Sequence, residues 1–273
     1  MFITDKLIYI QMPKTGCTHI ALLLSQIFDG KEAEKHIAAS KDQINSGIYL
    51  LSSIRNPWDW YLSLWTFGVQ GNGRLMNQLT RRNYRHALKL TLKNPLKNHF
   101  ALFYEATKDI FCWRDVYDES TSVESFRKWL KLIHNPSNAH WLSDGYGDFA
   151  VNEFCGFMSY RYLMLCCSNP DNLKNSKIIS SYADLVEFEK KNCYINFFIR
   201  QESLEDNFCK AVEKIKPLTQ KEKDAIFEAK KTNASKRPLG VSDYYDQESI
   251  DLIYNRDRLL IEKFNYTPPK IAK

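Results

Sequence analysis

The residues best suited to chemistry lie near the start of the chain, in the run Pro-Lys-Thr-Gly-Cys-Thr-His at positions 13–19. A strand is predicted before this run and a helix after it, so successive backbone N–H groups and the positive end of a helix would point toward one place. Gly16 lets the backbone approach a bulky anion, Thr18 adds a hydroxyl donor and Lys14 adds a mobile positive charge. The run predicts a phosphate-binding loop, with an ordinary strand-to-helix turn as the alternative. In this run the lysine precedes the glycine, so the run differs from the loop of nucleotide triphosphatases.

A second run, Ser-Ser-Ile-Arg-Asn-Pro-Trp-Asp-Trp-Tyr-Leu-Ser, occupies positions 52–63. Arg55 would leave the end of a strand, Pro57 would start a helix, and Ser63 would follow nearly two turns later. A guanidinium and a hydroxyl in these places are suited to hold one phosphate. The alternative is an arginine at a sheet edge and a serine on a helix surface.

Taken together, the two runs resemble those of sulfotransferases that use 3′-phosphoadenosine 5′-phosphosulfate (PAPS), especially the branch with many bacterial and carbohydrate enzymes. The resemblance implies that the first loop holds the 5′-phosphosulfate through Lys14, Thr15, Gly16, Cys17 and Thr18. It implies that Arg55 and Ser63 hold the 3′-phosphate. The expected product is adenosine 3′,5′-bisphosphate, and no metal ion is required. The sequence departs from this branch at Trp60, where a basic residue is common, and at Cys17, where a smaller residue is usual.

Two later segments resemble the same family more weakly. Residues 198–208 look like a recurrent strand-to-helix segment of these enzymes. Residues 233–237, followed by Tyr244, look like their C-terminal nucleotide loop. Lys236 and Arg237 are therefore candidates to close over the cofactor, with a solvated basic loop as the alternative.

Sulfuryl transfer needs charge stabilisation on the leaving oxygen and a base for the acceptor hydroxyl. Lys14 is suited to the first role. Related carbohydrate sulfotransferases carry a histidine between the two motifs that resembles the base, and His36 lies in this interval. His19 is expected to face packing or the cofactor, while His134 and His140 are expected at acceptor contacts or the surface. In other branches the base is a glutamate, so an acidic residue is the competing candidate.

The acceptor is predicted from charge and aromatic content. No acidic residue occurs between Asp59 and Glu105, whereas seven basic residues do: Arg74, Arg81, Arg82, Arg85, Lys89, Lys93 and Lys97. Four of these recur every fourth residue from Arg81 to Lys93, which predicts one basic helix face. This favours a saccharide or glycolipid hydroxyl on an anionic acceptor, and a solvated face is the alternative. Most aromatic side chains that follow Arg55 are expected in the core.

The elements that must position these residues follow from periodicity and turn residues. Strands are predicted at 7–10, 49–54 and 194–199, and helices at 18–28, 57–67, 121–133, 202–215, 219–230 and 247–264. Capping boxes are predicted at Thr121 and Thr219. Strands separated by helices predict an α/β single domain over 1–273, with a central parallel sheet flanked by helices and a P-loop-like strand, loop and helix for the phosphosulfate. Residues from about 70 to 170 are predicted to form a largely helical acceptor-binding insertion.

Composition restricts the class of protein. The chain has 273 residues, 44% of them hydrophobic and 26% charged, with a net charge of +6. These values suit a folded protein with an anionic ligand and do not require nucleic acid. We expect a soluble, cytoplasmic protein with reduced thiols. The seven cysteines are scattered without a CxxC pair, and the sequence shows neither a signal peptide nor an apolar run of about 20 residues. Two alternatives to a sulfotransferase are a P-loop-type nucleotide kinase and a non-catalytic basic module that binds acidic polymers.

Overall fold

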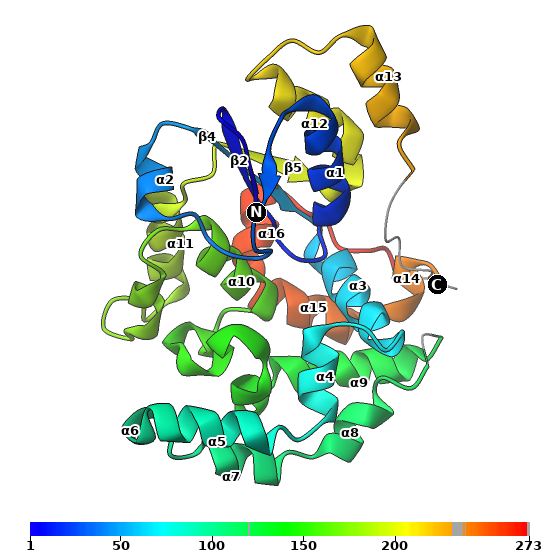
Figure 1. The fold of residues 1–273 in the computed structure, drawn as a ribbon. Helices are drawn as coiled ribbons and strands as arrows, with labels where there is room; N and C mark the ends of the chain where they lie inside the picture. The colour runs from blue at the N-terminus through cyan, green and yellow to red at the C-terminus, as the bar shows by residue number, and fades with distance from the viewer. Residues whose placement is uncertain (120, 231–236, 238, 272–273) are drawn as a thin grey trace.

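A mixed five-stranded sheet lies within an α/β fold (Figure 1). The computed structural model describes residues 1–119, 121–230, 237 and 239–271. Three strands run parallel to one another: β2 (Leu7–Ile10), β4 (Tyr49–Ile54) and β5 (Phe197–Arg200). Strand β1 (Phe2–Ile3) runs antiparallel to both of its neighbours, β2 and β3 (Lys31–Glu32). The strand order is β3-β1-β2-β4-β5, so the expectation of a wholly parallel sheet was wrong at one edge.

The antiparallel edge has a local cause. The Thr4 hydroxyl accepts hydrogen bonds from the backbone N–H groups of Lys6 (3.1 Å) and Leu7 (2.9 Å), which closes a tight turn between β1 and β2. Strand β3 consists of two exposed charged residues, so it carries no apolar alternation from which it could be predicted.

Alternate residues of the parallel strands enter two different hydrophobic clusters. On β2, Leu7 and Tyr9 face one cluster while Ile8 and Ile10 face the other. The first cluster is shared with α1 (Cys17–Ile27), α12 (Leu204–Glu213) and α13 (Gln220–Glu228). The second is shared with α3 (Pro57–Val69), α10 (Phe157–Cys166), α15 (Gln247–Arg256) and α16 (Arg258–Phe264). Helices therefore cover both faces of the sheet, as predicted.

Most of the remaining helices lie between β4 and β5 in the sequence and below the sheet in Figure 1. They are α4 (Arg74–Thr80), α5 (Tyr84–Lys93), α6 (Pro95–Asn98), α7 (Ala101–Thr107), α8 (Ile110–Asp115), α9 (Val123–His134) and α11 (Tyr182–Asn192). Two short helices outside this group are α2 (Lys41–Asn45) and α14 (Val241–Tyr244). The region from 70 to 170 is thus largely helical, and its binding of an acceptor stays a prediction.

Three predicted boundaries need correction. Helix α9 is capped by the Ser122 hydroxyl, which accepts from Ser125 N at 3.1 Å, and not by Thr121, whose hydroxyl donates to Glu119. Arg81 ends α4, so it does not share the exposed face of α5 with Arg85 and its successors. The fifth strand begins at residue 197 because residues 193–194 pair with 166–168 instead. The capping box at Thr219 is confirmed.

The predicted helix at 247–264 breaks at Asp257, whose buried carboxylate accepts hydrogen bonds from the Tyr61 hydroxyl (2.6 Å) and from Ser159 N (2.8 Å). Asp257→Ala would leave both buried donors without an acceptor, so we expect the free energy of unfolding to fall by about 3–5 kcal/mol. Urea unfolding measures this fall. Asp251→Ala, which changes an exposed residue of the same helix, is the matched control. A loss below about 1 kcal/mol for Asp257→Ala would contradict this account of the break.

All seven cysteines are free thiols, and five of them are buried. The prediction that most of the cysteines are buried is therefore confirmed. Within the described ranges, no helix combines the length and apolar character needed to cross a membrane.

Candidate functional site

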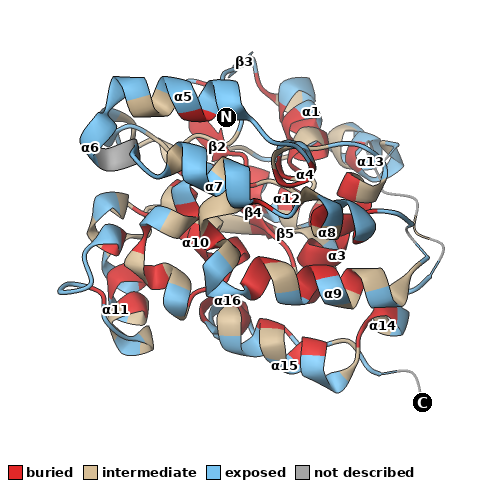
Figure 2. Ribbon diagram, turned by 90° about the horizontal axis from the view of Figure 1, so that it is seen from below, coloured by how far each residue is buried: buried red, intermediate tan, exposed pale blue. Residues whose placement is uncertain are grey.

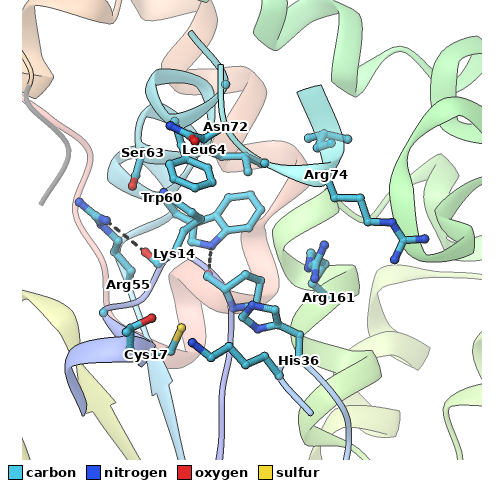
Figure 3. Close-up of a pocket in the computed structure, with 18 of the residues that line it drawn as sticks. Lys14, Cys17, His36, Arg55, Trp60, Ser63, Leu64, Asn72, Arg74 and Arg161 are labelled. Carbon is cyan, nitrogen blue, oxygen red and sulfur yellow. Dashed lines mark hydrogen bonds between the residues drawn. The ribbon is translucent and has the colours of Figure 1, made fainter. Parts of the chain in front are cut away.

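A cavity of about 940 Å³ opens between the two sequence motifs and the helices that follow β4. Its walls carry six basic side chains, Lys14, Lys35, Arg55, Arg74, Arg161 and Arg237, against two acidic ones, Glu34 and Asp144. Figure 3 shows Arg55 and Ser63 on one side of Trp60, Arg74 and Arg161 on the other, and His36 below. The cavity is therefore a strongly basic site with two charged walls.

The first motif forms the tight connection between β2 and α1. Lys14 and Gly16 both adopt left-handed backbone conformations, with φ of 63° and 80°. A Cβ atom on Gly16 would lie 2.9 Å from a methyl group of Leu204, so glycine is required both by conformation and by space. Gly16 caps α1 without a side-chain hydrogen bond to the first-turn amides. Gly16, Cys17 and Thr18 all line the cavity, which places the start of α1 at its wall.

The second motif contributes a charged triad that consists of Arg55, Asp59 and Arg237. Asp59 accepts from Arg55 Nε at 2.7 Å and Nη2 at 2.5 Å, and from Arg237 Nη1 at 2.5 Å. Burial by itself raises the pKa of the Asp59 carboxyl, but the two arginines outweigh it and leave the pKa lowered. Arg55 also donates from Nη1 to the Lys14 carbonyl at 3.1 Å. Among the described residues, three of its five N–H bonds are used, and two remain for a ligand.

Trp60 joins the two motifs. Its ring is fully buried, and its indole N–H donates to the Pro13 carbonyl at 2.8 Å. Ser63, one turn further along α3, is nearly buried and lines the same cavity. The aromatic residue at position 60 therefore holds the first loop against α3.

Lys14 is held in an apolar setting. Its ammonium lies 3.8 Å from the centroid of the Phe67 ring. Burial, with a contribution from Arg55, lowers the pKa of Lys14 from 10.5 to about 8. Lys14 is thus mostly charged at neutral pH and becomes neutral at mildly basic pH.

His36 lines the cavity in a defined tautomeric state. Its Nδ1 lies 2.8 Å from the Gln11 carbonyl oxygen. Because a carbonyl only accepts, Nδ1 carries the proton and Nε2 keeps its lone pair in the neutral ring. Burial is the main cause that lowers the pKa of His36, and the charge of Arg161 contributes. Neutral His36 can therefore accept a proton through Nε2.

The other histidines differ in position. His19 is buried and lines the cavity, so it is the only other histidine among the cavity-lining residues that the structure describes. His134 is buried, with Nδ1 2.8 Å from the Leu130 carbonyl. The His140 ring packs against Tyr104, with centroids 4.0 Å apart.

Most of the far wall of the cavity was not predicted as part of the site; of its charged residues, only Arg74 belongs to the basic stretch that was expected to favour an anionic acceptor. Arg161 of α10 pairs with Asp144 at 2.5 Å, and Arg74 lies 3.9 Å from the same carboxylate. Arg161 follows His36 by more than a hundred residues, and no local motif marks it. Asp59, which pairs with two arginines of the opposite wall, was also missed, although its position four residues after Arg55 is a pairing signal.

Three predicted features lie apart from the cavity wall or beyond the described residues. The Thr15 hydroxyl is buried and turned away, donating to the Met12 carbonyl and bonding the Ser53 hydroxyl, each at 2.6 Å. Lys236 lies outside the described residues. Helix α5 lies among the helices farthest from the sheet (Figure 1), and much of it is exposed (Figure 2). Its basic residues are exposed, and none of them lines the cavity among the residues described.

The described part of the chain contains one group of potential metal ligands, Cys167, Glu189 and Cys193, whose ligand atoms lie within 4.8 Å of one another. None of the three lines the cavity. Glu189 already accepts from the Tyr162 hydroxyl at 2.6 Å and pairs with Lys263 at 2.8 Å. The Cys167 thiol hydrogen-bonds to Cys193 and lowers its pKa. These three side chains are therefore held by hydrogen bonds and an ion pair within the protein, and they lie apart from the candidate site.

The sequence matches no protein-family model, and no curated protein or solved structure is significantly similar to the chain.

Proposed function

We propose that the protein transfers a sulfuryl group from PAPS to an acceptor hydroxyl. The observation that carries this proposal is that residues of both motifs line the same cavity. Lys14 and the start of α1 come from the first motif, and Arg55 and Ser63 come from the second. Loop and helix amides with Lys14 suit the 5′-phosphosulfate, while the two spare N–H groups of Arg55 suit the 3′-phosphate. A cavity of about 940 Å³ has room for a nucleotide and part of an acceptor. Cys17 takes part through its backbone, and Arg237, together with Lys236, is the candidate to close over the nucleotide.

The proposed step follows from the positions of Lys14 and His36. The acceptor oxygen attacks sulfur while the bond between sulfur and the bridging oxygen of the 5′-phosphate breaks. The hydroxyl proton passes to His36 Nε2, and the electron pair leaves with the phosphate oxygen of adenosine 3′,5′-bisphosphate. Lys14 stabilises the negative charge that develops on that bridging oxygen. Acceptor, sulfur and leaving oxygen need to be roughly in line, so positioning by the two walls supplies much of the rate.

A nucleotide kinase is the competing function, and one observation counts against it. Such an enzyme needs a carboxylate at a strand end to hold magnesium. The residue that ends β4 here is followed by Arg55, and the nearest carboxylate of the motif, Asp59, is fully engaged by two arginines. A basic module that binds acidic polymers would not need a histidine held in one tautomer inside a cavity, as His36 is.

Calorimetric titration with adenosine 3′,5′-bisphosphate, ATP and 5′-AMP tests the proposal, with and without magnesium. We expect the bisphosphate to bind most tightly and independently of magnesium. Magnesium-dependent preference for ATP would assign the chain to the kinases. Affinity for the bisphosphate that falls steeply with salt and matches that for other anions would support the polymer-binding module instead.

The affinity for adenosine 3′,5′-bisphosphate should depend on pH through Lys14. Its pKa is lowered to about 8, so the unbound protein loses this positive charge as the pH rises through 8, whereas a bound anion favours the charged form. Affinity should be constant near pH 7 and fall by up to about tenfold per unit above pH 8, where the phosphates are already fully ionised. Titrations between about pH 7 and pH 10 measure this dependence, and Lys14→Gln should bind more weakly without it. An equal pH dependence in Lys14→Gln would assign the titration to another group.

A further inference from the structure

The far wall of the cavity repeats the arrangement of the cofactor wall. In each, one aspartate lies between two arginines: Asp59 between Arg55 and Arg237, and Asp144 between Arg161 and Arg74. Each triad carries one net positive charge, because two guanidinium groups face one carboxylate. A cavity with two such triads is suited to two anionic groups, and the proposed cofactor accounts for one wall only.

Arg161 has N–H groups left for a ligand, and they lie on the Nε–Nη2 edge of its guanidinium group. Its contacts to Asp144 (2.5 Å) and to the Ser143 hydroxyl (3.4 Å) both use Nη1. Among the described residues, its buried Nε has no hydrogen-bond partner and no residue bonds to its Nη2. Nε and Nη2 form the fork that matches the two oxygens of a carboxylate. In Arg55, by contrast, this same edge is taken by Asp59.

Arg161 is held in place by its surroundings. Its side chain is 16% exposed, and its guanidinium carbon lies 5.6 Å from the centroid of the Phe157 ring, which also lines the cavity. A buried donor without a partner costs about 1–3 kcal/mol, so an anion that bonds to it recovers this cost. Arg74 is 78% exposed and can add a second, mobile charge at the cavity mouth.

We propose that the far wall binds a carboxylate of the acceptor, so that the acceptor is an acidic saccharide, such as one that contains a uronic acid. The inference rests on the proposed sulfuryl transfer and names its acceptor class. The carboxylate pairs with Nε and Nη2 of Arg161, which anchors the sugar across the cavity from the cofactor triad. A neighbouring hydroxyl then lies between the two walls, on the side of the cavity where His36 is found (Figure 3). Arg161 is a positioning residue for the acceptor and takes no part in the proton transfer.

Two oligosaccharides that differ only in charge test this assignment. One is an unsulfated oligosaccharide that contains glucuronic acid, and the other is the same molecule with its carboxyl groups reduced to alcohols. Their affinities are measured by calorimetry in the presence of saturating adenosine 3′,5′-bisphosphate. We expect wild type to prefer the acidic form by about 10–100-fold, Arg161→Gln to lose that preference, and Arg161→Lys to keep only part of it. Affinity for the bisphosphate itself should be unchanged in both variants.

Arg258→Gln is the matched control, because it removes an exposed arginine that pairs with Glu262 away from the cavity. Equal affinity of wild type for the two oligosaccharides, no binding of either, or an intact preference in Arg161→Gln would each overturn the acidic-acceptor inference. These outcomes are distinct from failure of the proposed function, which would appear as absent binding of adenosine 3′,5′-bisphosphate to wild type.

Discussion

The His36→Asn variant is expected to transfer sulfate about 10²–10⁴ times more slowly than wild type while it binds adenosine 3′,5′-bisphosphate equally well. The reason is that Nε2 of His36 is the neutral acceptor nitrogen in the cavity, oriented by the Nδ1 contact to the Gln11 carbonyl. Asparagine is preferred to alanine because His36 has a φ of 61°, a conformation that asparagine tolerates best among residues with a side chain. Its amide can also donate to the Gln11 carbonyl. The variant therefore removes the base and leaves the backbone and its hydrogen bond.

The measurement is the turnover of PAPS with the acidic oligosaccharide, followed over pH. Burial lowers the pKa of His36, so the neutral ring persists to pH values below 6.5, the ordinary pKa of histidine. Wild-type turnover should therefore fall only at pH values below 6.5, where the ring becomes protonated. The acid limb should disappear in His36→Asn. His140→Asn is the control for loss of a histidine outside the cavity. Turnover near that of wild type in His36→Asn would remove this residue from the mechanism and leave an acidic residue as the candidate base.

The parts of the fold and site that the sequence predicted depend on short-range patterns. The strands at 7–10 and 49–54 and the helices that follow them were found because their apolar residues are contiguous or periodic and because Pro57 and Asn56 mark a helix start. The two motifs lie at the ends of these strands, and parallel neighbours place their ends at the same sheet edge. The meeting of Lys14 and Arg55 therefore follows from the topology.

The parts that were missed depend on long-range contacts or on very short elements. The break at Asp257 exists because its carboxylate bonds to Tyr61 and Ser159, neither of which is near it in the sequence. Strands β1 and β3 have two residues each, too few for any periodicity. Arg161 lies in a helix that is buried along most of its length, and only the folded chain brings it to the cavity. Single-sequence patterns describe neighbours in sequence, so they cannot supply a wall built from distant helices.

The Arg55→Ala variant is expected to lose about 100-fold or more in affinity for adenosine 3′,5′-bisphosphate and to show no measurable transfer. Each charge-assisted hydrogen bond from its two spare N–H groups contributes about 1.5 kcal/mol or more, and 1.4 kcal/mol corresponds to a factor of ten in affinity. The variant also leaves the buried Asp59 with Arg237 as its remaining cationic partner among the described residues, so urea unfolding has to show that the fold persists. Arg55→Lys keeps a charge without the guanidinium fork and should recover only part of the affinity.

A second ligand separates the role of Arg55 from a general loss of positive charge. 5′-AMP lacks the 3′-phosphate, so Arg55→Ala should leave its affinity close to that of wild type, whereas Lys14→Gln should weaken both ligands because it acts on the 5′ end. The coupling between the Arg55 substitution and the presence of the 3′-phosphate measures their direct interaction. Equal losses for both ligands in Arg55→Ala would mean that Arg55 acts through the loop, by way of its bond to the Lys14 carbonyl, and not as the 3′-phosphate ligand. In that case Ser63, which lines the same wall, and Arg237 would be the residues left to recognise the 3′-phosphate.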